Sequence, residues 1–342
     1  MLPPARSHLL SHSRLSRLLH DRKKKRRARQ EIRQYYSGTY HGLPSAQLMY
    51  DMASQVNKHD NDMLWYALVG LTDQLVHERI MWERYVQYYH NFKDEVQERF
   101  VASGKDAEGG GGVDGSQDSG SSSFSRGSED RIDCCEDFRF MAYRHWALHD
   151  SMFHSNCLAT RLKIWTEPGR ALLAEFLAKM GISMEQSQQR FSAMDRRIRD
   201  NMMSKMEQYA DEFELTGAKL TMPTFTRSVG FVTRVSSSDV VYSLVGLLEN
   251  VSGTPTERFH NALDSLALSN SSCRAKFDKG VASAITMQQA LVEQGVALIE
   301  KKMIRSLGPM RMGILVEGHS HRFFQHPITL SKLALFIVNV FR

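Results

Sequence analysis

The chain has 342 residues, of which 42% are hydrophobic and 24% are charged, and its formal net charge is +6. This composition is typical of a globular protein with room for two or three domains, and it excludes a chain that is disordered throughout. Its four cysteines show no CxxC or Cys/His ligand spacing, which indicates a reducing compartment and argues against a zinc or iron–sulfur site. They are Cys134, Cys135, Cys157 and Cys273.

The positive charge is concentrated at the start of the chain. Residues 1–29 hold ten Lys and Arg against one acid, so residues 30–342 carry a net charge of −3. The cluster "DRKKKRRAR" suits nuclear import or non-specific phosphate binding, and a solvated charged helix end explains it equally well. The candidate import residues are Lys23, Lys24, Lys25, Arg26 and Arg27.

Targeting to another compartment is an alternative for the same segment. Residues 1–20 are rich in Arg, Ser and Leu and contain no acid, a composition that also describes a mitochondrial transit peptide. No apolar run reaches the roughly 18 to 20 residues that span a bilayer, and the best, "LALFIVNVF", is about half that length. The sequence therefore predicts no membrane contact.

The first predicted elements are helices within residues 36–101. Ser45 is a candidate N-cap for a helix with apolar residues at helical spacing. Those residues are Leu48, Met49, Met52, Ala53 and Val56. The following run, Met63 to Val69, is apolar on all sides, which fits either a buried helix or a central strand. Gly70 is expected to interrupt this run, and Thr72 to cap another helix.

Residues 102–132 separate the chain into two parts. This segment is dominated by Gly, Ser and acidic residues and has very few large apolar side chains. Such a segment cannot bury enough apolar surface to offset the entropy lost on ordering. We therefore predict a disordered, flexible linker here.

Residues 133–215 predict a compact, all-helical module. A first helix presents an apolar face that runs from Phe138 to Met152, and a second runs from Leu172 to Met180. Gly181 is expected to end the second helix, and "SMEQ" (Ser183 to Gln186) forms a capping box that begins a third. The third helix carries Phe191, Met194, Ile198 and Met202.

Residues 216–305 combine a strand with helices. The alternation in "MPTFTRSVGFVT" (residues 222–233) predicts a strand, and "SSSD" is expected to cap the apolar helix that follows. A long helix is predicted from Arg274 to Arg305, about 45 Å in length. Strand-like alternation returns in "MRMGILVEG", within residues 306–342.

One group of acidic residues and a histidine could bind a metal. Its members, which lie within 19 residues, are Asp60, Asp62, Asp73, His77 and Glu78. Divalent-metal phosphoesterases use such groups to bind metal and activate water. The alternative is structural, because carboxylates also stabilise helix N-termini.

Two further patterns are weaker. His145 and His149 have the spacing of a zinc-binding helix, but Trp146 stands where the HExxH motif has glutamate, so packed or interfacial histidines are favoured. A stripe of Met and aromatic residues predicts core packing, with partner docking as the alternative. The stripe consists of Phe176, Met180, Phe191 and Met194. No Walker A or GxSxG motif occurs.

Several segments resemble, in the same order, those of a known family. They are "YHGLPSAQLMYDMA", "NDMLWYALVGLTDQ", "HWALHDSM", "EFLAKMGI", "QRFSAMD", "VGFVTRVSSSDVVYSL" and "ALDSLALSN". The chain is identified by them as a member of the cell division control protein 45 family, which descends from the RecJ-like DHH phosphoesterases. The resemblance runs from about residue 22 to the end, interrupted by the linker, and is far more specific than any single motif above.

The resemblance implies an α/β, predominantly helical fold in a truncated or partial member of the family. Residues 1–35 would be a basic arm, and residues 36–101 the remaining part of a DHH phosphoesterase-like domain. Residues 133–215 would be the all-helical insertion, followed by a strand and helices in residues 216–305. Residues 306–342 would be a truncated DHHA1-like C-terminal part.

The implied function is that of a non-catalytic scaffold subunit of the eukaryotic replicative helicase. Members of the family act in the nucleus, on chromatin, and bridge the minichromosome maintenance hexamer and the GINS complex during initiation and fork progression. The insertion makes these contacts, and its candidate residues here are Phe176, Met180, Phe191, Met194 and Asp195. Weak binding of single-stranded DNA is implied, without a cofactor and without a membrane.

The resemblance also gives a meaning to Asp73. The turn "GLTDQ" resembles the one that supplies a metal-binding Asp in active DHH phosphoesterases, but the DHH triplet and the other ligands have no counterpart here. One carboxylate cannot hold a two-metal site, so Asp73 is expected to be a vestigial ligand at a helix entry. The alternatives are a metal-dependent DHH-type phosphoesterase or nuclease acting on single-stranded nucleic acid, and a mitochondrial protein of unknown activity.

Overall fold

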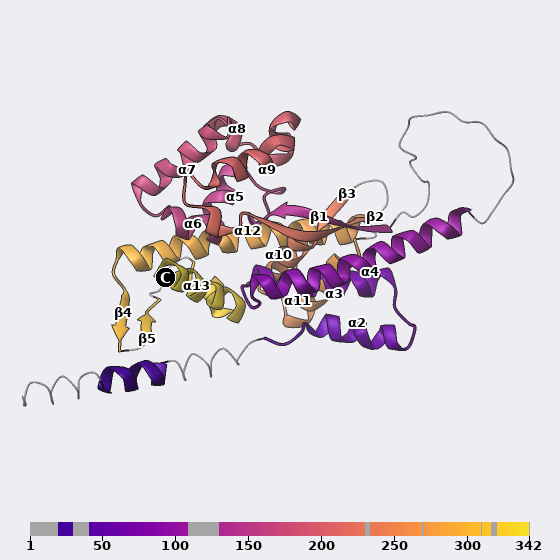
Figure 1. Cartoon of the computed structure of the whole chain (residues 1–342), viewed down its shortest axis with the longest axis horizontal. Helices are drawn as coiled ribbons and strands as arrows, with labels where there is room; N and C mark the ends of the chain where they lie inside the picture. The colour runs from indigo at the N-terminus through magenta and orange to yellow at the C-terminus, as the bar shows by residue number, and fades with distance from the viewer. Residues whose placement is uncertain are drawn as a thin grey trace, which may run out of the picture. The chain divides into compact units, whose positions relative to one another are not determined.

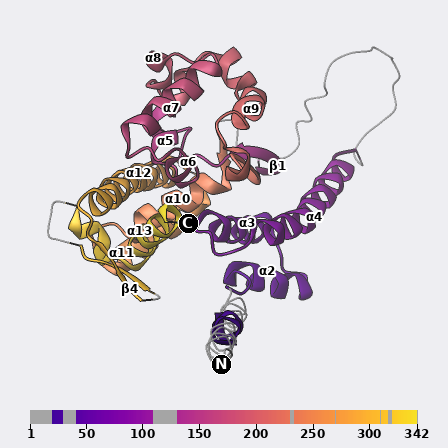
Figure 2. The ribbon, with the colours of Figure 1, turned by 60° about the vertical axis from the view of Figure 1, so that its left-hand side comes forward.

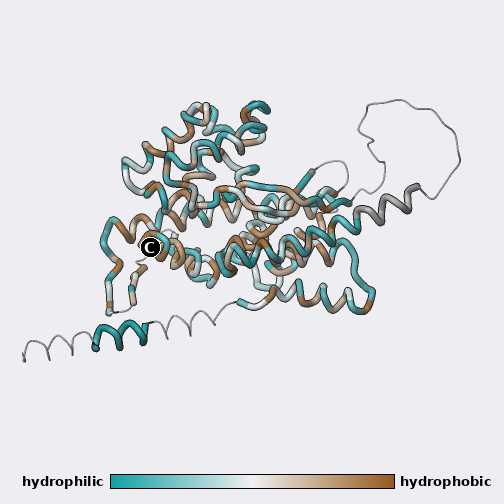
Figure 3. Tube along the Cα trace, viewed as in Figure 1, coloured by the Kyte–Doolittle hydropathy of each residue, from teal (hydrophilic) through white to brown (hydrophobic). Residues whose placement is uncertain are grey.

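The computed structural model describes residues 20–29, 41–108, 130–229, 233–268, 270–308, 310–315 and 320–341. The chain forms two compact units, Met1–Leu43 and Pro44–Arg342. In the first unit, residues 20–29 form a helix whose side chains are all exposed. Figure 3 shows that this helix is hydrophilic along its whole length, so it has no apolar face to bury.

Helix α3 (Asn61–Val76) lies at the centre of one core of the second unit. Its residues Leu64, Trp65, Leu68 and Leu71 are at most 1% exposed. The all-apolar run is therefore a buried helix and not a strand. Its neighbours are α2 (Ser45–Gln55), α4 (Trp82–Glu108) and α10 (Ser237–Leu248).

Helix α2 packs on α3 through the face opposite to the predicted one. Its buried residues are Gln47 and Tyr50, whereas Leu48, Met49, Met52 and Val56 are 48 to 64% exposed. The predicted break at Gly70 is wrong, because α3 continues through it. A Cβ at this position would lie 3.1 Å from Pro44 Cβ, so the glycine allows the start of α2 to approach α3 closely.

Three antiparallel strands form one sheet in the order β1-β2-β3. They are β1 (Asp130–Phe138), β2 (Thr221–Val229) and β3 (Thr233–Ser236). The predicted strand is confirmed over β2, where Phe225 is fully buried and lies opposite Cys134 of β1. Because β1 and β2 are hydrogen-bonded neighbours, residues 139–220 form an insertion between two paired strands.

This insertion, called the module below, is helical. It contains α5 (Leu148–His154), α6 (Asn156–Leu162), α7 (Glu167–Lys179), α8 (Met184–Ser187), η1 (Phe191–Ala193), α9 (Arg196–Ala210) and η2 (Thr216–Ala218). Figures 1 and 2 show its helices gathered on one side of the long helix α12. The predicted capping box is confirmed at Ser183 and Gln186, but it begins only the four-residue α8. The third predicted helix is therefore divided into three elements, of which the last, α9, has 15 residues.

The first helix predicted for the module is wrong over most of its length. Residues 133–138 belong to β1, so the segment 133–215 is not all-helical, and the helix itself begins only at Leu148. The loop between them is buried because two serines satisfy its backbone. Ser155 Oγ accepts from Met141 N, and Ser151 Oγ donates to Met141 O, both at 2.8 Å.

The longest helix, α12 (Ser271–Glu300), begins and ends earlier than predicted. The strands β4 (Ile304–Leu307) and β5 (Met310–Gly313) follow it and pair antiparallel. The remaining helices are α11 (Pro255–Ala267), η3 (His321–Gln325) and α13 (Pro327–Val340). The core of the module includes Leu298 of α12 and Phe336 of α13, so the module and the C-terminal helices share one core.

The predicted linker, residues 102–132, overlaps ordered elements at both ends. Helix α4 continues to Glu108, and β1 begins at Asp130. Asp130 is held in place by Arg227 of β2, whose Nε donates to the Asp130 carboxylate at 2.6 Å. Residues 109–129 lie outside the described part of the chain.

Candidate functional site

The candidate import residues, Lys23 to Arg27, lie on the exposed helix of residues 20–29. Consecutive residues of a helix point in directions about 100° apart, so these cations surround the helix. This arrangement gives a diffuse positive surface and not a shaped phosphate pocket. Recognition as an import signal stays a prediction.

The Met and aromatic stripe lies mainly inside the module. Phe176 and Met180 are fully buried, and Met194 is 4% exposed. Phe176 packs edge-on against the Phe213 ring, with centroids 5.1 Å apart. These three side chains cannot contact a partner directly, so within the stripe any direct contact is left to Phe191.

Phe191 is the first residue of η1 and Asp195 is the N-cap of α9, and both lie beside several exposed arginines. The Phe191 ring is partly buried against Tyr143, at 4.8 Å between centroids. Asp195 is exposed and caps α9 by accepting from Arg197 N at 2.9 Å. We call this surface the α9 face, and its residues are Arg190, Phe191, Asp195, Arg196 and Arg197.

The α9 face has a net positive charge that sequence reasoning did not identify. Among the described residues, the ion pair of this face joins Arg196 to Asp200 at 3.4 Å, and these side chains are 85% and 66% exposed. The first turn of α9 contains no acid, although helix N-termini usually favour acids and disfavour cations. The run "RRIR", residues 196–199, was the signal in the sequence that could have predicted this positive surface. Its first two arginines are exposed, and such a surface suits an acidic partner.

Asp73 lies in the last turn of α3, so its predicted position at a helix entry is wrong. Its Oδ1 lies 2.9 Å from His77 Nδ1, and its Oδ2 accepts from Arg79 at 2.8 Å. Burial alone would raise the pKa of this carboxyl, but the His77 hydrogen bond and the charges of His77, Arg79 and Lys332 hold it below its usual value. Both oxygens are thus engaged in contacts that stabilise the end of α3.

The acidic group around Asp73 is divided between the two ends of α3. Asp60 caps the start of the helix by accepting from Met63 N at 2.7 Å, and Asp62 pairs with Arg227 at 2.6 Å. About 20 Å of helix separates Asp60 from Asp73. In the part of the chain that the structure describes, no three His, Cys, Asp or Glu side chains are grouped to hold a metal ion.

His145 and His149 do not lie on one helix, so the predicted zinc-like spacing is lost. His145 belongs to the loop before α5, and its Nε2 is 3.8 Å from Asp239 Oδ2. His149 lies in α5 and contacts the Asp150 carboxylate at 3.1 Å. All four cysteines are free thiols.

A buried ionic cluster joins the module to the sheet and to α10. Its members are Asp137, Tyr143, Arg144, Ser236 and Asp239. The two carboxylate side chains are 1% and 3% exposed, and burial raises the pKa of Asp239 despite the charge of Arg144. Sequence reasoning missed this cluster because its residues are up to 102 positions apart and form no motif.

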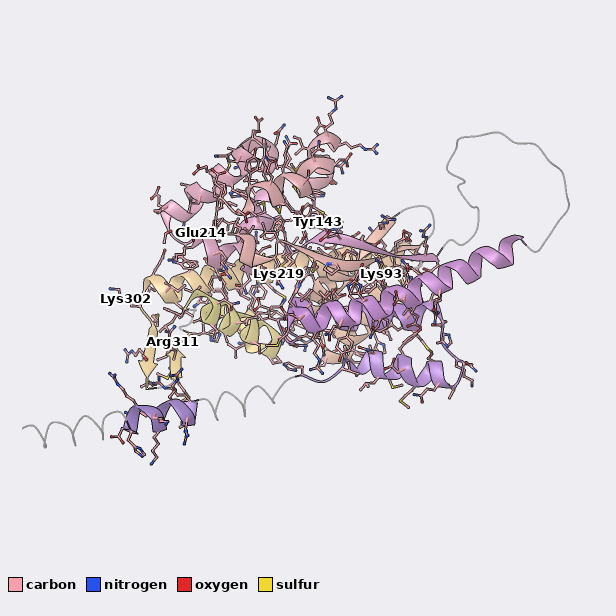
Figure 4. The ribbon with its side chains drawn as sticks, viewed as in Figure 1. Lys93, Tyr143, Glu214, Lys219, Lys302 and Arg311 are labelled. Atoms are coloured by element: carbon pink, nitrogen blue, oxygen red, sulfur yellow. The ribbon has the colours of Figure 1, made fainter. Side chains whose placement is uncertain are left out.

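A cleft of about 1190 Å³ lies between the α3–α4 connection and the module. Lys219, which is labelled in Figure 4, lines it and places its Nζ 4.3 Å from the Trp82 ring centroid. A smaller chamber of about 80 Å³ adjoins this cleft, and both are lined in part by Glu78, Asn156 and Cys157. Sequence reasoning found Glu78 but not the chamber.

Comparisons with known proteins agree on one family. The CDC45 family model matches residues 5–255 and 251–342. The chain is 31% identical to the Cell division control protein 45 homolog of Dictyostelium discoideum over 323 residues, which cover 89% of this chain and 49% of that protein. It is also 31% identical to the Homo sapiens homolog over 332 residues, which cover 92% and 53% of the two chains.

The fold agrees with this family as well. The crystal structure of CDC45 from Entamoeba histolytica matches with a TM-score of 0.67 and 23% identity, covering 88% of this chain and 56% of that one. The chain thus spans about half the length of the curated relatives it matches. Among the described helices, none has both the length and the apolar character needed to cross a bilayer. The match of the family model over nearly the whole sequence shows that the chain belongs to the CDC45 family.

Proposed function

We propose that this chain is a non-catalytic scaffold subunit of the replicative DNA helicase. In this role it acts in the initiation of DNA replication and at the fork, in the nucleus, by bridging the minichromosome maintenance hexamer and the GINS complex. Family membership is the observation that carries the proposal. Residues 36–101 would then be part of a DHH-like domain and residues 306–342 part of a DHHA1-like domain, with weak contact to single-stranded DNA.

The module supports the scaffold role through its architecture. It is inserted between two paired strands, β1 and β2, and its core is continuous with α12 and α13. A rigid insertion of this kind presents its surface in a fixed orientation, which a bridging subunit needs. We propose that the α9 face docks on an acidic surface of a helicase partner, with Phe191 and Asp195 as contacts and Phe176, Met180 and Met194 as the core behind them.

Asp73 supports a structural role over a catalytic one. Each of its oxygens has a positively polarised partner in His77 or Arg79, and Asp60 and Asp62 stand at the far end of α3. A two-metal phosphoesterase needs several carboxylates that converge on a pair of ions about 4 Å apart. We therefore propose that Asp73 stabilises α3 and its neighbours.

Co-purification tests the docking proposal. Met180→Glu would put a charge into the core, so exposed residues are the better targets. We expect Arg190→Glu/Arg197→Glu to reduce co-purification with the hexamer and GINS about tenfold or more, because like charges would meet an acidic surface. Lys301→Glu/Arg305→Glu, an equal charge change at exposed residues near the β4–β5 hairpin, is the matched control.

If the control pair weakens binding as much as the α9-face pair, the charge effect is not local and the docking site is wrong. If the unchanged chain binds neither partner, the scaffold function is wrong.

A second assay addresses catalysis: incubation with Mn²⁺ and single-stranded DNA should give no turnover. Turnover that Asp73→Asn abolishes would support a DHH-type phosphoesterase or nuclease instead.

The subcellular localisation of the protein is tested separately. We propose that Lys23 to Arg27 form a nuclear import signal, since five consecutive cations are exposed on one helix. Replacing all five by Gln in a fluorescent fusion should move the protein from the nucleus to the cytoplasm. Nuclear accumulation that persists in this variant would show that another segment supplies the signal.

A further inference from the structure

The cleft between the α3–α4 connection and the module has a volume of about 1190 Å³. Most small-molecule pockets are smaller, roughly 300 to 1,000 Å³, so a segment of several residues suits this cleft better. Its lining contains as many basic as acidic side chains, and their distribution therefore determines which ligand it favours. The basic residues are Arg139, Arg161, Lys163 and Lys219, and the acidic residues are Glu78, Glu175, Glu212 and Glu214.

Three of the basic side chains meet at η2 and the Trp82 ring. Arg139 Nη1 donates to two carbonyl oxygens at the end of η2, at 3.1 and 3.3 Å, and its guanidinium carbon lies 5.8 Å from the Trp82 ring centroid. Lys219 Nζ lies 4.3 Å from the same centroid. The Arg161 guanidinium lies against Gly217, since a Cβ built there would be 3.6 to 3.9 Å from its atoms. We call Trp82, Arg139, Arg161 and Lys219 the cationic corner.

The charges of the cationic corner are available to a ligand. Lys219 contacts Glu83 at 3.7 Å, but these side chains are 40% and 78% exposed, and such a surface pair is weak. Arg161 is exposed, and neither it nor Arg139 forms an ion pair within the part of the chain that the structure describes. An anionic group among these cations would therefore gain charge-assisted hydrogen bonds and displace only water and one weak pair.

The acidic side chains lie on other parts of the lining. Glu212 pairs with Lys179 at 2.6 Å, and the charge of Glu175 acts on the same lysine. Glu78 accepts from two asparagine side chains, each at 3.2 Å, and Glu214 is exposed on the connection that follows α9 (Figure 4). A nucleic acid carries a phosphate at every nucleotide and would meet these carboxylates. A peptide can place its acidic groups at the cationic corner alone.

Exposed apolar side chains also line the cleft. Met81, which precedes Trp82 of the cationic corner, is 78% exposed, and Leu172 of α7 is 41% exposed. Covering apolar surface of this kind stabilises a complex. A ligand that covers both side chains and pairs with the cationic corner needs apolar groups beside its acidic ones.

We propose that this cleft binds a peptide segment of a partner protein in which acidic and apolar residues alternate. A carboxylate of the segment would accept from Arg139 and Arg161 and pair with Lys219, and its apolar side chains would contact Met81 and Leu172. The residues of the α9 face do not line this cleft. The site thus goes beyond the scaffold function and does not depend on it.

A titration of the full chain with a synthetic peptide tests the proposal. The probe is a fluorescein-labelled hexapeptide of alternating Glu and Leu, and fluorescence anisotropy measures its binding. We expect saturable binding, with at least tenfold weaker binding of the Gln–Leu and Glu–Ser peptides, which lack the charge or the apolar groups. In protein with ¹³C-methyl-labelled methionine, the Met81 resonance should shift on binding, whereas that of Met49, on the exposed face of α2, should not.

Charge-reversed variants locate the site. Arg161→Glu/Lys219→Glu should weaken binding of the Glu–Leu peptide about tenfold or more, because like charges would meet. Lys301→Glu/Arg305→Glu, the same change of charge at exposed residues in and before β4, should leave binding unchanged. All four side chains are exposed, so both variants should unfold at the temperature of the unchanged chain, measured by circular dichroism.

Three results would overturn the proposal. A Met81 resonance that does not respond to the Glu–Leu peptide would place its binding elsewhere. Loss of binding in Arg190→Glu/Arg197→Glu, with none in the cleft variant, would assign the peptide to the α9 face. An equal Met81 shift with single-stranded oligothymidine or inorganic phosphate, at a matched concentration of negative charge, would show that the cleft binds phosphate groups instead. The hexamer and GINS are absent from these assays, so a failure here leaves the scaffold function untouched.

Discussion

Arg144 donates two parallel hydrogen bonds to the carboxylate of Asp137, at 2.9 and 2.8 Å. The same guanidinium reaches Asp239 of α10 at 3.3 Å, so one cation serves two buried carboxylates. Bidentate pairs of this kind are strong and fix orientation. The cluster thereby fixes the entry loop of the module relative to the sheet and α10.

Removing this cation should destabilise the protein strongly. In Arg144→Met, two buried carboxylates lose an arginine partner, and we expect the free energy of unfolding to fall by about 3 to 5 kcal/mol. Arg196→Met, which breaks an exposed pair with Asp200, should cost less than about 1 kcal/mol. Urea denaturation of both variants measures the difference, and equal losses would contradict a structural role for the cluster.

A glycine contact between α10 and α12 should be equally sensitive. A Cβ at Gly246 would lie 2.1 Å from Gly280 O, and one at Gly280 would lie 2.3 Å from Ser243 Oγ. Gly246→Ala must therefore push two buried helices apart, and we expect a loss of about 3 kcal/mol or more.

Gly217→Ala is the control for this substitution, because its Cβ would meet only ordinary contacts, the nearest at 3.6 Å. Thermal unfolding monitored by circular dichroism distinguishes the two variants. If Gly246→Ala unfolds at the same temperature as the unchanged chain, the helices do not pack as closely as described.

Elements with a strong local signal could be predicted from the sequence. The capping box at Ser183, the stop at Gly181 and the alternation in β2 each depend on neighbouring residues, and the structure confirms all three. Local signals gave wrong predictions where tertiary contacts determine the structure. Helix α3 continues through Gly70, where α2 approaches it closely. Residues 139–147 form a loop whose backbone is satisfied by serines outside the loop.

The candidate sites also depend on tertiary contacts that local sequence signals do not predict. Composition could identify a Met and aromatic stripe, but not that Phe176 and Met180 point inward and leave an arginine-rich surface outside. The chamber joins His77 to Asn156 and Lys332, which are 79 and 255 positions away. No periodicity connects residues at such separations, so only the fold brings them together.

The two faces of α2 should respond oppositely to substitution. Met49 and Met52 are more than 60% exposed, whereas Tyr50 is 3% exposed, and its hydroxyl accepts from Arg99 at 2.7 Å. We expect Met49→Gln/Met52→Gln to change the free energy of unfolding by less than about 0.5 kcal/mol. Tyr50→Ala should cost about 3 kcal/mol or more. A large loss in the methionine variant would show that those side chains are covered.

Lys332 should make stability depend on pH in the alkaline range. Burial lowers its pKa to about 8 in the folded protein, while the unfolded chain keeps an ordinary lysine pKa of about 10.4. Between these values the unfolded state binds more protons, so the free energy of unfolding rises as pH increases from about 8 to 10. At pH 7 the folded chain holds a charged amine in an unfavourable site.

Lys332→Met removes this cost and shortens the unbranched side chain by one atom. With allowance for its partial exposure, we expect the variant to be more stable than the unchanged chain by about 2 kcal/mol at pH 7. The difference should shrink as pH rises toward 10, because the native lysine then loses its proton and its penalty. Urea denaturation at pH 7, 8, 9 and 10 measures this difference directly. A constant difference over that range would mean that the Lys332 amine titrates as an ordinary exposed lysine.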